Sequence, residues 1–380
     1  MKWFNTYTRL FGIGGLSIGL VVFLFLLSEQ QVHQNNAFTR RYPHHPIKKL
    51  YDLPIKFNSY YFAGKDNNML YLGNTTAPLH VLKINLKTKD TTHVNLNLSN
   101  GDLPFKAVKV HVWPPYFYIA DGSVPCIFRG VIGNWNTELW MKDKAYFTKS
   151  FPLDTNKIYI NTISSTTQLA TLGLIEKQGD FDVSLHPNIL EKQIDGMFDV
   201  DGTMVVSPDG QTLGYVYYYR NQFMVMDSSL GLLGRQETID TVRIAQIELS
   251  ETNKKGQVHM KAPPLKVNGT AALYNNFIMI NSPRLGKYDE PNMLDQASII
   301  DVYNWREQTY EFSFYLYHIE QKKIKEFRVY NNYLVAILDD MLSVYELKEE
   351  HFGHLKKMPQ ENKKLFKRIP AGNRMKTENL

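Results

Sequence analysis

The chain has 380 residues, of which 43% are apolar and 21% charged, a globular composition that excludes a largely disordered or collagen-like protein. The formal net charge is +6, but the basic residues form no continuous stripe, so nucleic acid is not an expected partner. The single cysteine, Cys126, excludes an intrachain disulfide and a cysteine-based metal centre, and its apolar neighbours predict a buried, inert thiol. The many Tyr and Phe residues favour strands.

The first predicted element is a membrane-spanning helix at residues 10–27. This stretch carries no charge, and a helix of its length spans roughly 27 Å, close to the thickness of a bilayer core. Lys2 and Arg9 precede it, which favours a cytoplasmic N-terminus and puts the remaining chain on the periplasmic or exterior side. A cleaved signal peptide is the alternative, although no Ala-x-Ala-like site follows Leu27. We therefore expect a single-pass protein of the cytoplasmic membrane, anchored through Leu10 to Leu27.

Two polar segments flank the body of the chain. Residues 29–50 contain Gln, Asn, His and Pro without an apolar period, which predicts a linker after an anchor at 1–28. Residues 351–380 are rich in Lys and Arg and predict a basic, disordered tail. The folded domain is therefore expected at 51–350.

The body of the chain repeats one pattern, which is a strand, a tight turn, a second strand, a polar loop and a third strand. The turns hold residues such as Asn-Asn, Pro-Pro and Pro-Asp-Gly, which favour tight reversals. The pattern returns at intervals of roughly 40 to 60 residues, a period typical of propeller blades. The repeats are expected to begin with strands at 59–62, 108–112, 157–160, 204–206, 271–274 and 327–330.

The expected fold class is all-β, a six-bladed β-propeller that follows the single N-terminal transmembrane helix. One four-stranded blade cannot bury both of its faces, so the blades pack around a central axis. The sixth repeat lacks a fourth strand, and residues 53–57 could supply it and close the ring, which would remove two exposed sheet edges. The irregular third and fourth repeats leave the number of blades open by one.

Several phrases carry a resemblance to known proteins. The segment Ser-Pro-Asp-Gly-Gln-Thr-Leu-Gly-Tyr at 207–215 resembles the inner hairpin of TolB-like propellers. The segments at 114–118, 217–223 and 297–303 resemble a group of uncharacterised bacterial proteins that pair an N-terminal membrane segment with a propeller-like domain. This resemblance implies a scaffold and carries over no catalytic residue. Some of these proteins accompany small membrane proteins of the DoxX type, which implies an envelope or redox-associated membrane protein as a partner.

The loops between second and third strands offer a candidate binding face. In a propeller these loops gather near the axis on one side, and a polar rim there is what a binding surface needs. The long fifth loop adds Tyr288, Asp289 and Glu290. The candidate residues in the loops of the repeats are Asn74, Thr75, Asp121, Ser123, Ser165, Arg220, Asn281 and Arg284.

The favoured function is a membrane-anchored module that binds or docks a protein or a small ligand, rather than an enzyme, and no cofactor is predicted. One alternative is a propeller hydrolase or lyase that holds a divalent metal such as Ca²⁺ at the loop face.

A second alternative rests on one motif. The run Asp-Val-Asp-Gly-Thr at 199–203 matches the signature of haloacid-dehalogenase-type phosphatases, in which the first Asp attacks phosphorus. The Ser-Pro-Asp-Gly turn that begins at Ser207 and the strand that follows it favour a hairpin instead, because phosphatases of this type need a parallel α/β sheet.

Overall fold

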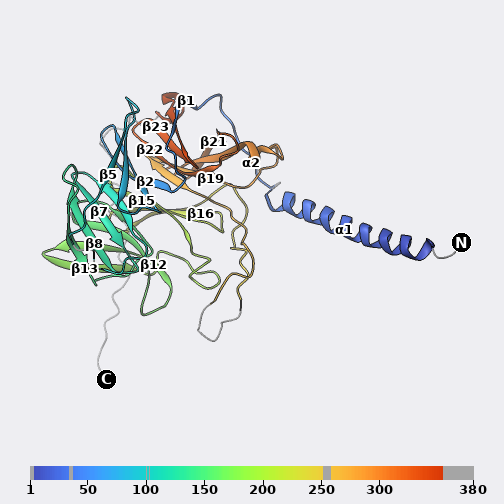
Figure 1. Cartoon of the computed structure of the whole chain (residues 1–380), viewed down its shortest axis with the longest axis horizontal. Coiled ribbons are helices and arrows are strands. Elements are labelled where there is room, and N and C mark those ends of the chain that lie inside the picture. The colour runs from blue at the N-terminus through green and yellow to red at the C-terminus, as the bar shows by residue number, and fades with distance from the viewer. Residues whose placement is uncertain (1–3, 34–36, 100, 102, 251–257, 354–380) are drawn as a thin grey trace, which may run out of the picture.

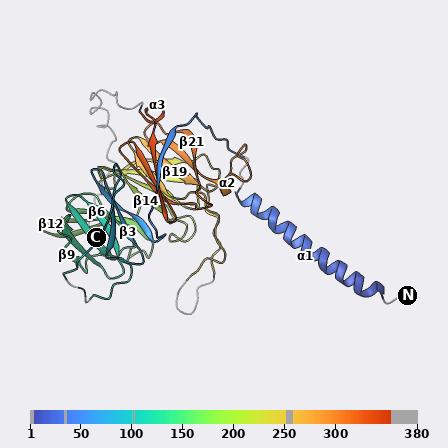
Figure 2. The same cartoon turned by 45° about the horizontal axis from the view of Figure 1, so that its top comes forward.

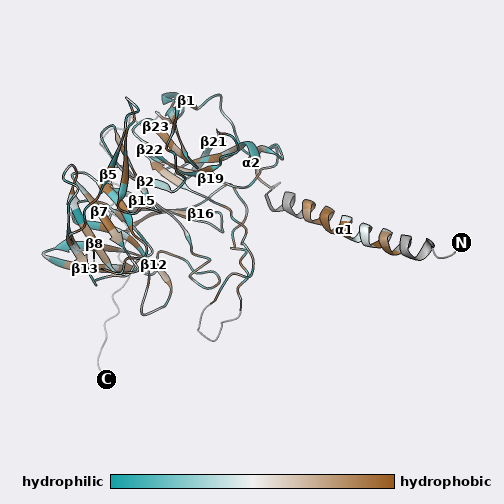
Figure 3. Ribbon diagram, viewed as in Figure 1, coloured by the Kyte–Doolittle hydropathy of each residue, from teal (hydrophilic) through white to brown (hydrophobic). Residues whose placement is uncertain are grey.

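The computed structural model describes residues 4–33, 37–99, 101, 103–250 and 258–353 (Figure 1). Helix α1 (Phe4–His33) projects away from the sheets beside the short helix α2 (Met293–Gln296), as Figures 1 and 2 both show. The part Leu10–Leu27 is long and apolar enough to cross a membrane (Figure 3). None of it is buried. A signal sequence would meet the same description. The predicted apolar helix is therefore confirmed as an element.

The rest of the described chain is mostly strand, arranged as six four-stranded antiparallel units in which sequential strands pair. Unit 1 holds β2 (Tyr60–Asp66), β3 (Met69–Asn74), β4 (His80–Asn85) and β5 (Thr91–Asn95). Unit 2 holds β6 (Lys109–Trp113), β7 (Tyr116–Asp121), β8 (Cys126–Val131) and β9 (Thr137–Lys142). Unit 3 holds β10 (Lys149–Pro152), β11 (Lys157–Ile163), β12 (Ala170–Gln178) and β13 (Asp180–His186).

The second half of the chain continues the pattern. Unit 4 holds β14 (Gly202–Val206), β15 (Thr212–Tyr217), β16 (Gln222–Asp227) and β17 (Leu232–Glu237). Unit 5 holds β18 (Ala271–Tyr274), β19 (Phe277–Ser282), β20 (Ala297–Asn304) and β21 (Thr309–Tyr317). Unit 6 holds β22 (Ile324–Tyr330), β23 (Tyr333–Leu338), β24 (Met341–Leu347) and, from the far end of the sequence, β1 (Ile47–Pro54); the short helix α3 (Glu349–Phe352) follows.

The hydrophobic core lies between the units rather than inside one of them. Six clusters of buried side chains each join a pair of consecutive units, and one of them joins Leu72 of unit 1 to Ile337 of unit 6. The first strands of units 1 and 2 also run parallel and meet at Gly64 and Val112, which merges these two units into one eight-stranded sheet. Because the four-stranded units pack face to face on their neighbours, the architecture is propeller-like.

The N-terminal strand completes the last unit. β1 pairs with β24 from Ile47↔Leu347 to Pro54↔Met341, with a bulge near Leu50. The predicted fourth strand of the last unit is therefore present, but it begins at Ile47 and not at residue 53, and it lies partly inside the segment expected to be linker. Residues 354–380, where most of the predicted basic tail falls, lie outside the described residues.

A pair of cysteines should lock the pairing of β1 with β24. Asp52 and Ser343 are register partners, and the Ser343 hydroxyl donates to the Asp52 carboxylate at 2.6 Å. We expect the double variant Asp52→Cys, Ser343→Cys to form a disulfide under mild oxidation and to gain about 2–4 kcal/mol in the free energy of unfolding. Thiol counting and urea unfolding of the oxidised and reduced protein measure this. The mismatched pair Lys48→Cys, Ser343→Cys should stay reduced; equal cross-linking of both pairs would contradict the register.

Two predicted repeats differ from the structure in detail. The third was expected to begin at 157–160, but that segment forms the second strand of unit 3, and β10 precedes it. The fourth strand of unit 4, β17, was not expected at all. Both strands exist because a neighbouring strand pairs with them, β11 with β10 and β16 with β17.

Candidate functional site

Each unit has two ends that differ in what they carry. Strands alternate in direction within a unit, so three features of the unit fall at the same end. These are the start of its first strand, the loop between its second and third strands, and the end of its fourth strand. We name this end the connection end. The opposite end, with the hairpin between the first and second strands, is the hairpin end. Neighbouring units share this orientation: Lys149 at the start of β10 donates to the Gly202 carbonyl at the start of β14 at 2.7 Å, and Lys325 of β22 donates to the Tyr60 carbonyl of β2 at 2.8 Å.

The eight candidate residues lie at the connection end, and the structure separates them into two groups. Thr75, Ser123 and Ser165 are exposed, and Asn281 is half-buried. Asn74, Asp121, Arg220 and Arg284 are buried. That the exposed residues form a binding face stays a prediction.

The buried acids and amides of this set hold their own loops. Asp121 accepts backbone hydrogen bonds from Lys106, Ala107, Ser123 and Val124 at 2.6–3.1 Å. These bonds lower the pKa of its carboxyl although burial alone would raise it. Asn74 caps the next turn in the same way, since its side-chain oxygen accepts from the backbone N–H of Thr76 at 2.9 Å.

The two buried arginines also make contacts within the fold, although Nε and Nη2 of Arg220 are buried without a hydrogen-bond partner among the described residues. Arg284 pairs with Asp240 at 2.7 Å. Arg220 donates to the Glu191 carbonyl at 2.9 Å, and its guanidinium lies 3.6 Å from the centre of the Tyr217 ring. A cation over an aromatic face in this geometry stabilises a buried charge. Both side chains therefore support the loops between units 3, 4 and 5.

The long fifth loop binds the segment that follows α1. The Arg40 guanidinium is fully buried and contacts Asp289 of the loop and Asp301 of β20, the latter at 2.8 Å. Burial alone would lower the pKa of Arg40, but the carboxylates of Asp301 and Asp289 raise it above its ordinary value. Tyr42 donates to Asp289 at 2.8 Å and stacks on Tyr315. We name the segment 37–46 the strap, because it runs along β21 before β1 begins.

The Asp-Val-Asp-Gly-Thr motif forms a turn. The Asp199 carboxylate is fully buried and accepts backbone hydrogen bonds from each residue of 193–196 at 2.5–3.2 Å. Asp201 is half-exposed and pairs with Lys149 at 3.2 Å. β14, which begins within the motif, pairs antiparallel with β15, in contrast to the parallel α/β sheet that the phosphatase chemistry requires. Asp199 therefore anchors the loop that enters unit 4.

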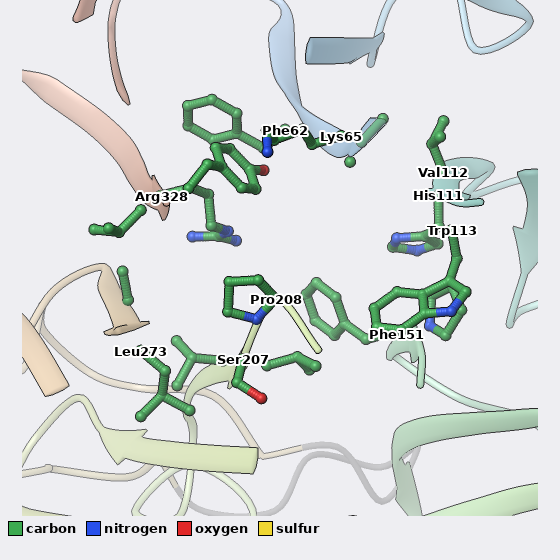
Figure 4. A pocket seen from close by; sticks show the side chains of 18 of the residues that line it. Phe62, Lys65, His111, Val112, Trp113, Phe151, Ser207, Pro208, Leu273 and Arg328 are labelled. Atoms are coloured by element: carbon green, nitrogen blue, oxygen red, sulfur yellow. The ribbon is translucent and has the colours of Figure 1, made fainter. Parts of the chain in front are cut away.

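A cavity of about 370 Å³ lies where the first strands of all six units converge, toward the hairpin end. Its walls mix aromatic, aliphatic and basic side chains (Figure 4). The side chains that shape it are Phe62 and Lys65 of β2, His111 and Trp113 of β6, Phe151 of β10, Val205 of β14, Leu273 of β18, and Arg328 and Tyr330 of β22.

The polar groups of this cavity face one another. Arg328 and His111 point toward the same space from opposite walls (Figure 4). Arg328 donates to the Phe327 carbonyl at 2.9 Å and is 3.5 Å from Glu326. Lys65 approaches the Tyr330 ring at 5.5 Å. Two cations in a half-buried aromatic setting favour an anionic occupant.

His111 is a neutral member of the cavity. Burial, together with the charges on Lys109 and Arg328, lowers its pKa to about 4. Its Nε2 lies 3.5 Å from the Ser150 hydroxyl. Burial likewise lowers the pKa of Lys65, while Asp66 opposes that shift. At neutral pH the wall therefore offers one imidazole, the two cations of Lys65 and Arg328, and the carboxylate of Asp66.

The sequence-based prediction missed this cavity because it looked to the loops of the connection end. One signal was available: Lys65, His111 and Arg328 all lie in first strands, where charged residues are rare in an all-β core. Among the described residues, no three His, Cys, Asp or Glu side chains are grouped so that they could hold a metal ion. The metal-dependent alternative stays a prediction.

The chain was compared with known proteins. No family model matches it, and no curated protein does. A solved structure of a DUF4221 family member from Bacteroides vulgatus is similar, with a TM-score of 0.51 and 11% identity over 80% of this chain and 97% of that one. The β-propeller domain of Cps50 (Swd1) from Myceliophteria thermophila gives a TM-score of 0.43 and 8% identity over 80% of this chain and 100% of that one. At such identities the first likeness shows a shared fold alone.

Proposed function

We propose that this chain is a six-bladed β-propeller, tethered by α1 to the outer side of the cytoplasmic membrane, that binds a small anionic ligand between its first strands. The six four-stranded units, the six interunit core clusters and the pairing of β1 with β24 support the blade count. The apolar span at Leu10–Leu27 and the basic residues Lys2 and Arg9 support the tether and its direction. An envelope or redox-associated membrane protein would then be a second partner.

The observation that carries this proposal is the cavity to which every unit contributes. A volume of about 370 Å³ suits a ligand of small-molecule size. Trp113 and Phe151 offer faces for an apolar or aromatic part, while Arg328 and Lys65 offer donors for a carboxylate or similar anion. We therefore expect a ligand that combines one negative charge with a flat apolar group.

A pair of probes with matched shape and opposite charge tests this expectation. Indole-3-acetate should stabilise the detergent-solubilised full chain, by about 1.4 kcal/mol at ten times its dissociation constant, because it binds the folded state only. Tryptamine, which replaces the carboxylate by an ammonium group, should not. Thermal unfolding at equal concentrations of the two compounds measures the difference. Equal stabilisation by both compounds would contradict an anion site.

Variants place the binding in the cavity. Arg328→Met keeps most of the volume and removes the cation, so the affinity for indole-3-acetate should fall at least about tenfold. Lys65→Met is a second variant at the same wall. Arg306→Met changes an exposed arginine outside the cavity and should leave the affinity unchanged. If Arg306→Met lowers the affinity for indole-3-acetate as much as Arg328→Met does, the probe binds outside the cavity.

A further inference from the structure

The tether enters the domain at the connection end of unit 5. The backbone N–H of Lys287 donates to the Phe38 carbonyl of the strap at 2.8 Å, and Arg40 is buried between Asp289 and Asp301. Leu26 near the end of the apolar span lines a groove together with residues of the loop that carries α2. The distance that the chain can span from Leu27 to Phe38 is at most about 25 Å, counting six residues at the rise of a helix and five at the rise of a fully extended chain. The connection end of unit 5 is therefore held close to the surface that α1 crosses.

Apolar side chains project from the loops around this point. Tyr288 in the fifth loop is 77% exposed, Ile244 between units 4 and 5 is 68% exposed, and Phe57 between units 6 and 1 is 56% exposed. These three loops belong to an arc of neighbouring units that contains the tether. Moving each such side chain from water into an apolar phase would contribute about 1.5–3 kcal/mol.

Each of the three side chains follows a basic residue. Lys287 lies 5.3 Å from the centre of the Tyr288 ring, and it is exposed, as is Lys56 before Phe57. Arg243 before Ile244 is exposed as well and shares only a surface ion pair with Glu237, a contact of little energy. Aromatic and aliphatic tips beside Lys and Arg are the arrangement that suits the boundary between lipid headgroups and acyl chains. The basic neighbours would meet anionic headgroups.

We infer that this arc of the connection end, with Phe57, Ile244 and Tyr288 at its tips, lies against the surface of the membrane that α1 spans and takes anionic lipid headgroups. This inference rests on the proposed tether. It turns the connection end toward the lipid and leaves the hairpin end, with the ligand cavity, facing away from it. The cavity thus stays open to ligands from the aqueous side.

Collisional quenching of site-specific labels tests the inference on the full chain. Phe57→Cys, Ile244→Cys and Tyr288→Cys are made singly, labelled with an NBD fluorophore, and reconstituted in nanodiscs that contain about one third phosphatidylglycerol. Cys126 is fully buried and stays unlabelled in the folded protein. Lipids with a nitroxide near the headgroup should quench all three labels at least threefold more than they quench the control.

The control comes from the opposite end. Leu233 is 51% exposed and lies at the start of β17, near the hairpin end. The label of a Leu233→Cys variant should therefore stay far from the lipid. Lys287→Glu with Arg243→Glu should at least halve the quenching at Phe57 in anionic discs. Co-elution of the protein with the discs reports the tether independently. If the protein elutes with the discs but the three labels are quenched no more than the label at Leu233, the lipid-facing arc is overturned and the tether is not. If the protein elutes without discs, the tether is overturned as well.

Discussion

Replacing Arg40 by alanine should lower the free energy of unfolding by about 3–5 kcal/mol, the largest loss we expect from a single substitution in the strap. The guanidinium is fully buried and neutralises two carboxylates that are each only 3% exposed, Asp289 and Asp301. Its removal leaves both charges buried without a cation, and the Ser282 hydroxyl loses the N–H that it accepts at 2.9 Å. The unfolding midpoint should fall by about 10 °C for a domain of this size.

The neighbouring residue provides a matched control. Arg41 is exposed and makes its contacts with Tyr310 at the surface, so Arg41→Ala should cost less than about 1 kcal/mol. Arg40→Lys keeps the charge but loses the paired geometry toward Asp301, and it should fall between the two. Thermal and urea unfolding of the three variants in the same detergent decide the matter. An Arg40→Ala loss no larger than that of Arg41→Ala would show that the strap does not hold the domain.

Asp199→Asn should destabilise the protein by about 3 kcal/mol, although the two side chains have nearly the same shape. The carboxylate accepts four backbone N–H groups, and an amide turns an N–H₂ group toward some of these donors and loses the charge that strengthens the bonds. The control is Asp201→Asn in the same motif, which is half-exposed and should cost at most about 1 kcal/mol. Equal losses would contradict the role of Asp199 as the anchor of this loop.

The same carboxylate sets a pH dependence. Burial alone would raise the pKa of Asp199, but hydrogen bonds from Asp195 and from the backbone of Gln193, Gly196 and Ile194 lower it below its ordinary value. A lowered pKa in the folded state contributes stability above the unfolded pKa of about 3.9 and loses it as the pH falls through the folded value. The gap between the native chain and Asp199→Asn should therefore be constant from pH 5 to 7 and narrow below about pH 4. Unfolding midpoints measured across this range check the sign.

Much of the strand pattern could be predicted because its turns carry a local signal. Asn67, Asn275 and Asn331 each begin the turn of a first hairpin and have positive φ angles of 51–55°, which Asn tolerates better than most residues. Apolar residues on either side then mark the strands.

The strands that were missed lack such a signal. β10 is the four-residue run Lys-Ser-Phe-Pro at 149–152, and β17 has no buried residue, so neither shows an alternation of apolar and polar residues. β10 is a strand because it pairs with β11, and β17 is a strand because it pairs with β16. The strap was read as linker for a similar reason, because Arg40 finds its partners about 250 residues further along the chain.

The ligand cavity could not be located from the sequence. Lys65 and Arg328 lie in the first and last units, and only the packing of these two units against each other makes their strands neighbours. The loop residues that the repeat pattern did single out were polar for a different reason. Asp121 and Asn74 serve the hydrogen-bonding of the backbone within their own loops.

The pairing of β1 with β24 also constrains the order in which this protein can be completed. β1 leaves the ribosome before the other described strands, whereas its partner β24 spans Met341–Leu347, about 290 residues further along the chain. Until that strand emerges, the apolar side chains that unit 6 should cover on unit 1 remain open to solvent. Unit 6 therefore stays incomplete until β24 has been synthesised. Pairing across so long a stretch of sequence is slow, so this interval is when the protein most needs protection from aggregation.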